Sequence, residues 1–164
     1  MNSKEIIFTI PGKPQGKDRP RGFIKTQTFG NGLAAYKTGL KIKRTVGMIT
    51  TQKTVQYEYL IGVLAKQQMA GKEPFSCPMR VDILLFYPIS KSWIKVKKNN
   101  ARLGKMVPTV KPDIDNCTKA IFDALNHIVW VDDTQVVDKH VSKHFSDNPR
   151  VEVRITPLSH LLSV

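Results

Sequence analysis

The feature that most constrains the fold of this chain is an amphipathic helix that is preceded and followed by aspartates. Between residues 112 and 128, apolar side chains recur at the three- and four-residue spacing of one helical face. They are Ile114, Cys117, Ile121, Ala124, Leu125 and Ile128. Pro112 and Asp113 form a natural helix start, because the Asp113 carboxylate can cap the free N–H groups of the first turn. The segment therefore predicts a helix whose apolar face packs on the core.

Other segments carry helix and strand patterns of their own. Gln52–Met69 has apolar residues at helical spacing, and either Thr51 or Thr54 could cap its start. Alternation or apolar, β-branched composition predicts four strands: Glu5–Ile10, Met79–Tyr87, Gln135–Phe145 and Arg150–Pro157. Ser146–Pro149 has the composition of a turn, so we expect the last two strands to form a hairpin.

Charge limits the partners that the chain can have. The net charge is +13 at pH 7; residues 1–111 hold 21 Lys and Arg against five acids, whereas residues 112–164 hold five against eight. A basic excess favours a polyanionic partner, because binding to phosphates releases condensed counterions. The composition thus favours nucleic acid, although a basic surface that only keeps the protein in solution would look the same.

Composition also excludes several classes of protein. Hydrophobic residues make up 41% of the chain, so a packed core is expected. No window approaches ~18 consecutive apolar residues, which argues against a membrane span. The apolar run Ile6–Ile10 is too short for a signal peptide. Cys77 and Cys117 form no CxxC pair, so we expect a reduced, cytoplasmic protein without a zinc or disulfide framework.

Two basic segments are candidate DNA contacts. Residues 11–32 hold three prolines and five glycines and are predicted to form a long loop. Its candidate phosphate contacts are Lys13, Lys17, Arg19 and Arg21. Residues 89–112 contain no acid, and Trp93 within them could stack on an exposed base. The candidate contacts here are Lys91, Lys95, Lys97 and Lys98. The alternatives to DNA contact are a flexible insertion for the first segment and a solvated loop for the second.

The acidic residues are concentrated around the amphipathic helix. Six of the thirteen acids lie between residues 111 and 138. Carboxylates at a helix start and in a following loop can converge, but they repel each other unless a cation lies between them. Asp113, Asp115 and Asp133 would suit Mg²⁺, and Lys119 could stabilise charge in a phosphodiester transition state. Alternatively, Asp113 is only a helix cap, Asp115 and Lys119 only a surface ion pair, and Asp132–Asp133 only a turn.

The same segment resembles a known family. The string PDIDNCTKAIFDALNHIVWVDDTQVV has an Asp-x-Asp-Asn start, a Lys one turn on, an Asp-Ala-Leu, and then Asp-Asp-x-Gln-Val. This pattern is similar to the signature of the RusA family of Holliday junction resolvases. The N-terminal IPGKPQGKDRPR, residues 56–60 and the strand around Val81 also resemble phage and prophage members. The resemblance runs over nearly the whole chain, and its specific part is residues 112–137.

The resemblance implies a fold, a site and partners. It implies one RusA-like domain over residues 1–164, of α/β class, with a small mixed sheet of about four strands flanked by helices. Carried over by position, it makes Asp113, Asp115 and Asp133 the metal ligands, Lys119 the catalytic lysine and Asp132 a supporting residue. The implied protein is an Mg²⁺-dependent homodimer, with Mn²⁺ as an alternative ion. It would nick two opposed strands of a four-way DNA junction and leave 5′-phosphate ends, in recombination and repair.

Two other functions are consistent with parts of the sequence. A non-catalytic basic module that coats branched or single-stranded DNA would explain the charge, but not the clustered acids. The second alternative is a phosphoryl-transfer enzyme that acts on small molecules. It is suggested by Asp113-x-Asp115 followed by Thr118, which resembles the nucleophile motif of haloacid dehalogenases. That motif should follow an apolar strand, and here it follows residues 109–112, Thr-Val-Lys-Pro. The nuclease interpretation is therefore preferred.

Overall fold

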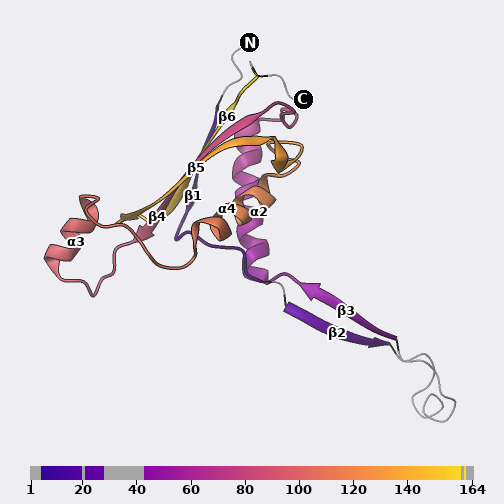
Figure 1. The fold of residues 1–164 in the computed structure, drawn as a ribbon, viewed down its shortest axis with the longest axis horizontal. Helices are drawn as coiled ribbons and strands as arrows, with labels where there is room; N and C mark the ends of the chain where they lie inside the picture. Colours follow the sequence, from indigo (N-terminus) through magenta and orange to yellow (C-terminus); the bar gives the residue numbers. More distant parts are fainter. Residues whose placement is uncertain (1–4, 20, 28–42, 160, 162–164) are drawn as a thin grey trace, which may run out of the picture.

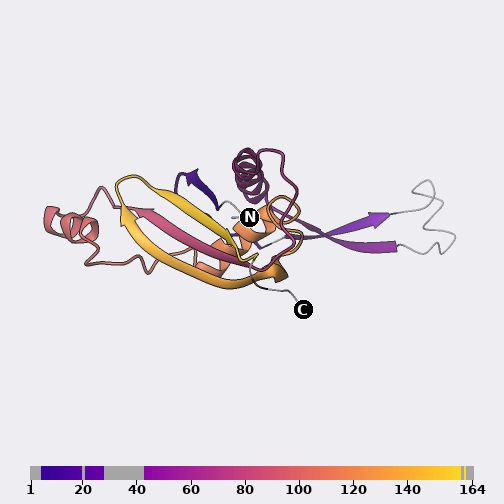
Figure 2. The same ribbon diagram turned by 90° about the horizontal axis from the view of Figure 1, so that it is seen from above.

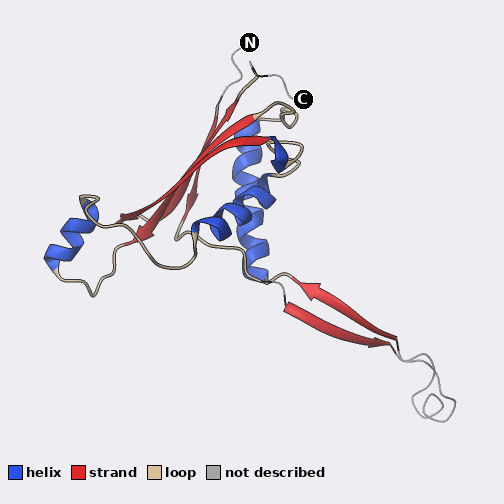
Figure 3. Cartoon of the chain, in the orientation of Figure 1, coloured by secondary structure: helices blue, strands red, loops and turns tan. Residues whose placement is uncertain are grey.

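The computed structural model of the protein describes residues 5–19, 21–27, 43–159 and 161. In chain order, its elements are β1 (Ile6–Pro11), β2 (Arg21–Gln27), β3 (Lys43–Ile49), α2 (Gln52–Met69), β4 (Met79–Pro88), α3 (Lys95–Arg102), α4 (Ile114–Leu125), η1 (Asp133–Gln135), β5 (Val136–Ser146) and β6 (Arg150–Pro157). Figure 1 traces them along the chain, and Figure 3 separates helices from strands. The part of the chain described has no helix with the length and apolar character that crossing a membrane requires.

A four-stranded mixed sheet forms the centre of the fold. Its strand order is β1-β6-β4-β5, in which β4 pairs in parallel with β5 and the other neighbours are antiparallel. A parallel pair needs a long crossover connection, and residues 89–135, which include α3 and α4, supply it. The predicted fold class, a small mixed sheet with helices, is confirmed.

Helices α2 and α4 cover one face of this sheet, as Figure 1 shows. Alternate residues of the strands turn toward them and are fully buried, for example Ile83 of β4 and Val153 of β6. The apolar stripe of α4 packs there as predicted, because Cys117, Ile121 and Leu125 are buried in the same core. Trp130, which follows α4, is the largest fully buried side chain. Hydrophobic burial therefore holds α4 in a defined orientation on the sheet.

The predicted hairpin between β5 and β6 is wrong. Both strands exist at close to the predicted bounds, but β4 lies between them and pairs with each. The turn after Ser146 therefore carries the chain past the end of β4. Turn composition shows where the chain reverses, whereas the choice of neighbouring strand depends on residues far away in the sequence.

Two segments for which the sequence predicted no helix or strand contain regular structure. Within residues 11–32, β2 pairs with the later strand β3 to form a two-stranded sheet. In the basic run 89–112, Lys95–Arg102 forms α3, a helix that buries only Ala101. Figures 1 and 2 show α3 and the β2–β3 ribbon at opposite ends of the molecule. Neither has the apolar periodicity that a core-packed element shows, which explains why sequence patterns missed them.

Candidate active site

The first turn of α4 carries two aspartates that figure in the sequence prediction. Asp113 is the N-cap of the helix, and its Oδ1 accepts a hydrogen bond from the backbone N–H of Asn116 at 3.0 Å. This bond uses one carboxylate oxygen for the cap. Asp115 lies two residues on and is exposed, as are Asp113 and Lys119. The predicted cap is confirmed, and the cap leaves the second oxygen of Asp113 available to a ligand.

The start of α4 is fixed to the ends of two strands. The carbonyl oxygen of Pro112 accepts hydrogen bonds from the hydroxyl of Tyr87 at 2.8 Å and from Nζ of Lys143 at 2.7 Å. Burial raises the pKa of Tyr87, so its phenol remains a neutral donor at physiological pH. Tyr87 belongs to β4 and Lys143 to β5. Consequently Asp113, the next residue, is held where these two strands end.

Asp113, Asp115 and Lys119 line one hollow of about 320 Å³, which we call the carboxylate hollow. The full lining is Lys17, Arg19, Asp113, Asp115, Asn116 and Lys119. It therefore brings together two of the three predicted metal ligands, the predicted catalytic lysine and two of the predicted DNA contacts. Beside the two carboxylates, Arg19 and Lys119 supply two cations that form no ion pair among the described residues, an arrangement suited to a phosphate and a divalent ion bound together.

The loop after β1 packs directly on α4 and forms one wall of the carboxylate hollow. The backbone N–H of Lys17 donates to the carbonyl oxygen of Asn116 at 3.2 Å. A Cβ atom at Gly16 would lie 2.7 Å from Nδ2 of Asn116 and 2.9 Å from Cβ of Pro112. Such distances are closer than van der Waals contact, so this position requires glycine. The close approach brings the basic loop to the two aspartates.

Lys17 has a different environment from the other predicted DNA contacts. Its ammonium forms ion pairs with Asp123 of α4 and, at 3.1 Å, with Glu58 of α2. Partial burial acts to lower the pKa of Lys17, but the hydrogen bonds and charges of Asp123 and Glu58 outweigh it and raise the pKa. Because two carboxylates already neutralise this ammonium, Lys17 ties the loop to both helices. Sequence reasoning missed Asp123 as its partner, although the Asp-Ala-Leu motif contains that residue.

Asp132 and Asp133 lie at the far end of α4 from Asp113. Asp132 caps η1 by accepting from the backbone N–H of Thr134, and hydrogen bonds from Thr134 lower its pKa. Gln135, the last residue of η1, donates to the carbonyl oxygens of Phe75 and Cys77, ahead of β4. Asp133 is thus near the start of β4, and Asp113 is near its end. The length of α4 alone, 12 residues, corresponds to about 18 Å.

The three predicted metal ligands therefore do not meet within one chain. Asp113 and Asp115 share the carboxylate hollow, whereas Asp133 is exposed on the order of 20 Å away. In the described ranges, no group of three or more His, Cys, Asp or Glu side chains is arranged to hold a metal ion. The sequence could not show this separation, because a helix between two motifs sets their distance only once its direction is known.

The remaining predicted DNA contacts lie in two places. Lys13 lines a second hollow beside the carboxylate hollow. Lys91, Lys95, Lys97 and Lys98 lie in or just before α3, where Lys97 is 4.2 Å above the ring of Trp93. Trp93 packs edge-on against Phe145, and Lys98 donates to the carbonyl oxygen of Lys91. The side chain of Arg21 is outside the described part of the structure.

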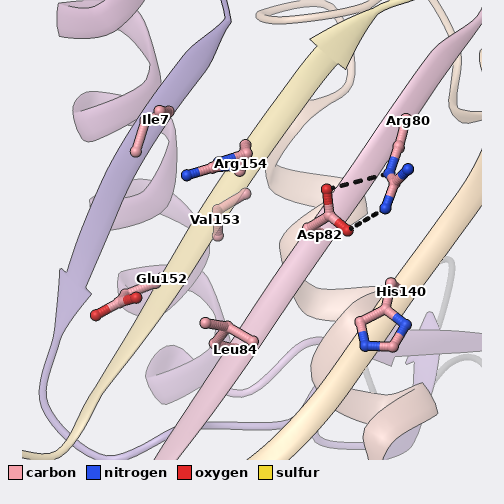
Figure 4. Close-up of a pocket in the computed structure, with 8 residues that line it drawn as sticks. All are labelled: Ile7, Arg80, Asp82, Leu84, His140, Glu152, Val153 and Arg154. Atoms are coloured by element: carbon pink, nitrogen blue, oxygen red, sulfur yellow. Dashed lines mark hydrogen bonds and ion pairs between the residues drawn. The ribbon is translucent and has the colours of Figure 1, made fainter.

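A further hollow, on the other face of the sheet, contains none of the predicted site residues. Figure 4 shows it with the helices behind the sheet. Its lining is Ile7, Arg80, Asp82, Leu84, His140, Glu152, Val153 and Arg154. Arg80 forms two hydrogen bonds to Asp82, so opposite charges neutralise each other there. Its position across the sheet separates it from the carboxylate hollow.

Two residues that line these hollows were not predicted from the sequence. Lys53 lies in the first turn of α2 and lines the second hollow, but no motif surrounds it. Asn116 lies between the two hollows and lines both. Its place directly after Asp115, in the Asp-x-Asp-Asn motif, was the signal that could have identified it.

Comparison with known proteins assigns the family. The sequence model described as endodeoxyribonuclease RusA matches residues 11–156. The chain is also 36% identical over 156 residues to the protein named "Uncharacterized protein YqaN" of Bacillus subtilis (strain 168), a match that covers 94% of this chain and 97% of the relative. The matched region contains the carboxylate hollow, β4, β5 and all but the last residue of β6, whereas only Pro11 of β1 lies within it. The chain belongs to the RusA endodeoxyribonuclease family.

Proposed function

We propose that this protein is a metal-dependent endonuclease that resolves four-way DNA junctions by nicking two opposed strands. The observation that carries the proposal is the carboxylate hollow, where Asp113 and Asp115 lie with Lys119 in an otherwise strongly basic protein. Acids beside a phosphate-binding surface would repel DNA unless a cation lay between them and the phosphate. Membership of the RusA endodeoxyribonuclease family supports the same conclusion.

The donor set of the carboxylate hollow suits Mg²⁺, with Mn²⁺ as an alternative. Mg²⁺ uses one or two protein carboxylates, several waters and substrate phosphate oxygens. Asp113 offers the oxygen that its cap leaves free, and Asp115 offers an exposed carboxylate. When bound, the ion would lower the pKa of a water molecule and polarise the phosphodiester.

The protein's own side chains supply the remaining requirements of hydrolysis. Lys119 lines the same hollow and is one helical turn from Asp115, so its ammonium can stabilise negative charge on the phosphate. Arg19 lines the same hollow and can hold the phosphate oxygens in place. Attack by water would break the bond to the 3′ oxygen, which yields a 3′ hydroxyl and a 5′ phosphate.

The position of Asp133 is most simply explained by a homodimer. Because this carboxylate is on the order of 20 Å from Asp113 in one chain, we propose that it joins the carboxylate hollow of a second copy. A two-fold dimer would then form two complete sites, each with Asp113, Asp115 and Lys119 from one copy and Asp133 from the other. Two equivalent sites match a junction, which offers two equivalent phosphates.

A cleavage assay on purified protein tests the proposal. The substrates are a labelled four-way junction and a linear duplex of the same sequence, each with Mg²⁺ and with EDTA. We expect paired nicks in the junction only, only with Mg²⁺, and with ends that ligase can rejoin. A junction that is shifted in a gel but never nicked would instead identify a non-catalytic DNA-binding module.

A further inference from the structure

A second hollow adjoins the carboxylate hollow and differs from it in charge. It has a volume of about 440 Å³ and is lined by Lys13, Pro14, Gln15, Gly16, Asp18, Lys53, Lys111, Pro112 and Asn116. We call it the lysine hollow. It shares Asn116 with the carboxylate hollow, and the loop after β1 borders both. The two hollows are therefore neighbours on one surface.

The three lysines of this hollow come from separate parts of the chain. Lys13 belongs to the loop after β1, Lys53 to the first turn of α2, and Lys111 to the segment before α4. All three are exposed, and among the described residues none of them forms an ion pair. Folding thus gathers three cations without supplying a carboxylate partner for any of them.

The single acid in the hollow is engaged elsewhere. The carboxylate of Asp18 accepts a hydrogen bond from the hydroxyl of Thr51 at 2.8 Å, and its backbone N–H donates to Thr54. Asp18 therefore helps to anchor the loop to the start of α2. Lys17 is paired with two carboxylates, whereas none of the described acids forms an ion pair with Lys13, Lys53 or Lys111.

We propose that the lysine hollow binds a backbone phosphate of the DNA strand that is cut, next to the phosphate in the carboxylate hollow. The ligand class is a phosphodiester, because three ammonium groups and a polar wall suit an anion. The shared Asn116 lets one strand cross from one hollow to the other. This inference rests on the proposed nuclease function, and it adds Lys53 and Lys111 as residues that position the strand.

The role of this second phosphate would be positioning rather than chemistry. A phosphate held at a fixed place beside the reacting one sets the register of the strand and contributes to binding affinity. The lysines of this hollow do not line the carboxylate hollow, so they act on the reacting phosphate only through the strand. Their removal should therefore raise KM and leave kcat nearly unchanged.

The experiment uses the full-length variant Lys53→Gln/Lys111→Gln and a matched control, Lys66→Gln/Lys72→Gln. The control lysines are exposed and lie near the other end of α2, around a separate hollow. Junction substrates carry one neutral methylphosphonate at successive positions near the cut site. Cleavage is measured under steady-state conditions, and binding is measured with EDTA at several salt concentrations. Thermal melting verifies that each variant is folded.

For the wild type, we expect a methylphosphonate at one neighbouring position to raise KM about tenfold. The lysine-hollow variant should show that tenfold rise on the natural junction and no further rise with the methylphosphonate. Its log–log salt slope for binding should fall by about one unit, as loss of one phosphate contact predicts. The control variant should behave as the wild type in all three measurements.

Two outcomes would overturn the inference. One is a variant whose KM and salt slope equal those of the control; the other is a variant that still loses tenfold with the methylphosphonate. If the wild type binds junctions but never cuts them, the nuclease proposal fails, and the salt slope still decides whether the lysine hollow holds a phosphate. The nuclease function and phosphate binding in the lysine hollow can therefore be refuted independently of each other.

Discussion

The ammonium of Lys17 pairs with the carboxylate of Asp123, which lies 106 residues further along the chain. Glu58 contacts the same ammonium, and all three side chains are about a quarter exposed. The contact joins the loop after β1 to the middle of α4 and to α2. These ion pairs therefore hold in place the loop that forms one wall of the carboxylate hollow.

Lys17→Met should destabilise the protein by about 1–2 kcal/mol, because it leaves two carboxylates close together without their cation. Partial exposure keeps the effect below that of a fully buried pair. Thermal melting should show a fall in Tm of several degrees. Lys13→Met is the matched control, since Lys13 is in the same loop and exposed. Asp123→Asn should lower the free energy of unfolding less in the Lys17→Met variant than in the wild type. Equal losses of stability in the two backgrounds would show that Lys17 and Asp123 are not energetically coupled.

Asp115→Asn should reduce junction cleavage by at least about 100-fold and leave junction binding unchanged or tighter. The substitution removes a metal ligand and also a negative charge that repels phosphate, while the basic surface remains. Single-turnover cleavage and gel-shift titration measure the two effects. Glu73→Gln serves as a control, because Glu73 is exposed and lines neither the carboxylate hollow nor the neighbouring lysine hollow. Cleavage by Asp115→Asn at the wild-type rate would refute the proposed metal site.

Mixing two inactive variants tests the shared site of the homodimer. If Asp133 acts on the second copy, a dimer of Asp115→Asn and Asp133→Asn retains one intact site. Random exchange makes about half of the dimers mixed, so nicking should return to about a quarter of the wild-type rate. Mixtures of Asp113→Asn with Asp115→Asn should stay inactive, because every dimer then lacks a ligand at both sites. No recovery in the first mixture would refute the sharing of Asp133 between copies.

Alkaline pH should destabilise the protein through Tyr57. Burial raises the pKa of this phenol to about 12, an effect that the backbone of Gln15 partly opposes. The unfolded state loses the proton near pH 10, so between about pH 10 and 12 it binds fewer protons than the folded state, and stability falls as pH rises. The loss should approach about 2–3 kcal/mol, measured by urea unfolding. Tyr57→Phe should reduce this dependence without abolishing it, because burial also raises the pKa of Tyr87. An unchanged slope would contradict the assignment.

Junction binding should weaken steeply with salt, with a log–log slope of several units. Part of that slope is assigned to α3, where Lys95 and Lys97 are exposed at one end of the molecule. Lys95→Ala/Lys97→Ala should lower the slope by one to two units, as measured by fluorescence anisotropy. The pair Lys66→Ala/Lys72→Ala should leave it unchanged. An unchanged slope in the α3 variant would show that α3 is not part of the DNA-binding surface.

Sequence patterns predicted the elements that bury an apolar face. The bounds of α2 and β6 agree with the structure residue for residue, and the Asp113 cap of α4 is where it was expected. Each of these signals lies in consecutive residues, so local spacing is enough to find it. The ribbon β2–β3 was missed because its strands pair across a long segment and bury little against the core.

The candidate site was predicted in part. Asp113, Asp115 and Lys119 lie within seven residues of one helix, so their spacing already places them on neighbouring turns. Asp133 follows that helix, and its distance from the others depends on where η1 docks beside β4. The pairing of Lys17 with Asp123, and the gathering of Lys13, Lys53 and Lys111, depend on how the loop after β1 crosses α2 and α4.

The sequence by itself determined which of the core-packed segments become helix or strand, the family of the chain, and the identity of the acids at the start of α4. Only the tertiary structure decided that β4 lies between β5 and β6, that Lys17 is paired, and that Asp133 is remote from Asp113. The physical reason is that local propensity and helix capping act between residues a few positions apart. Strand order, ion pairs and hollows depend instead on packing between residues that are distant in the chain.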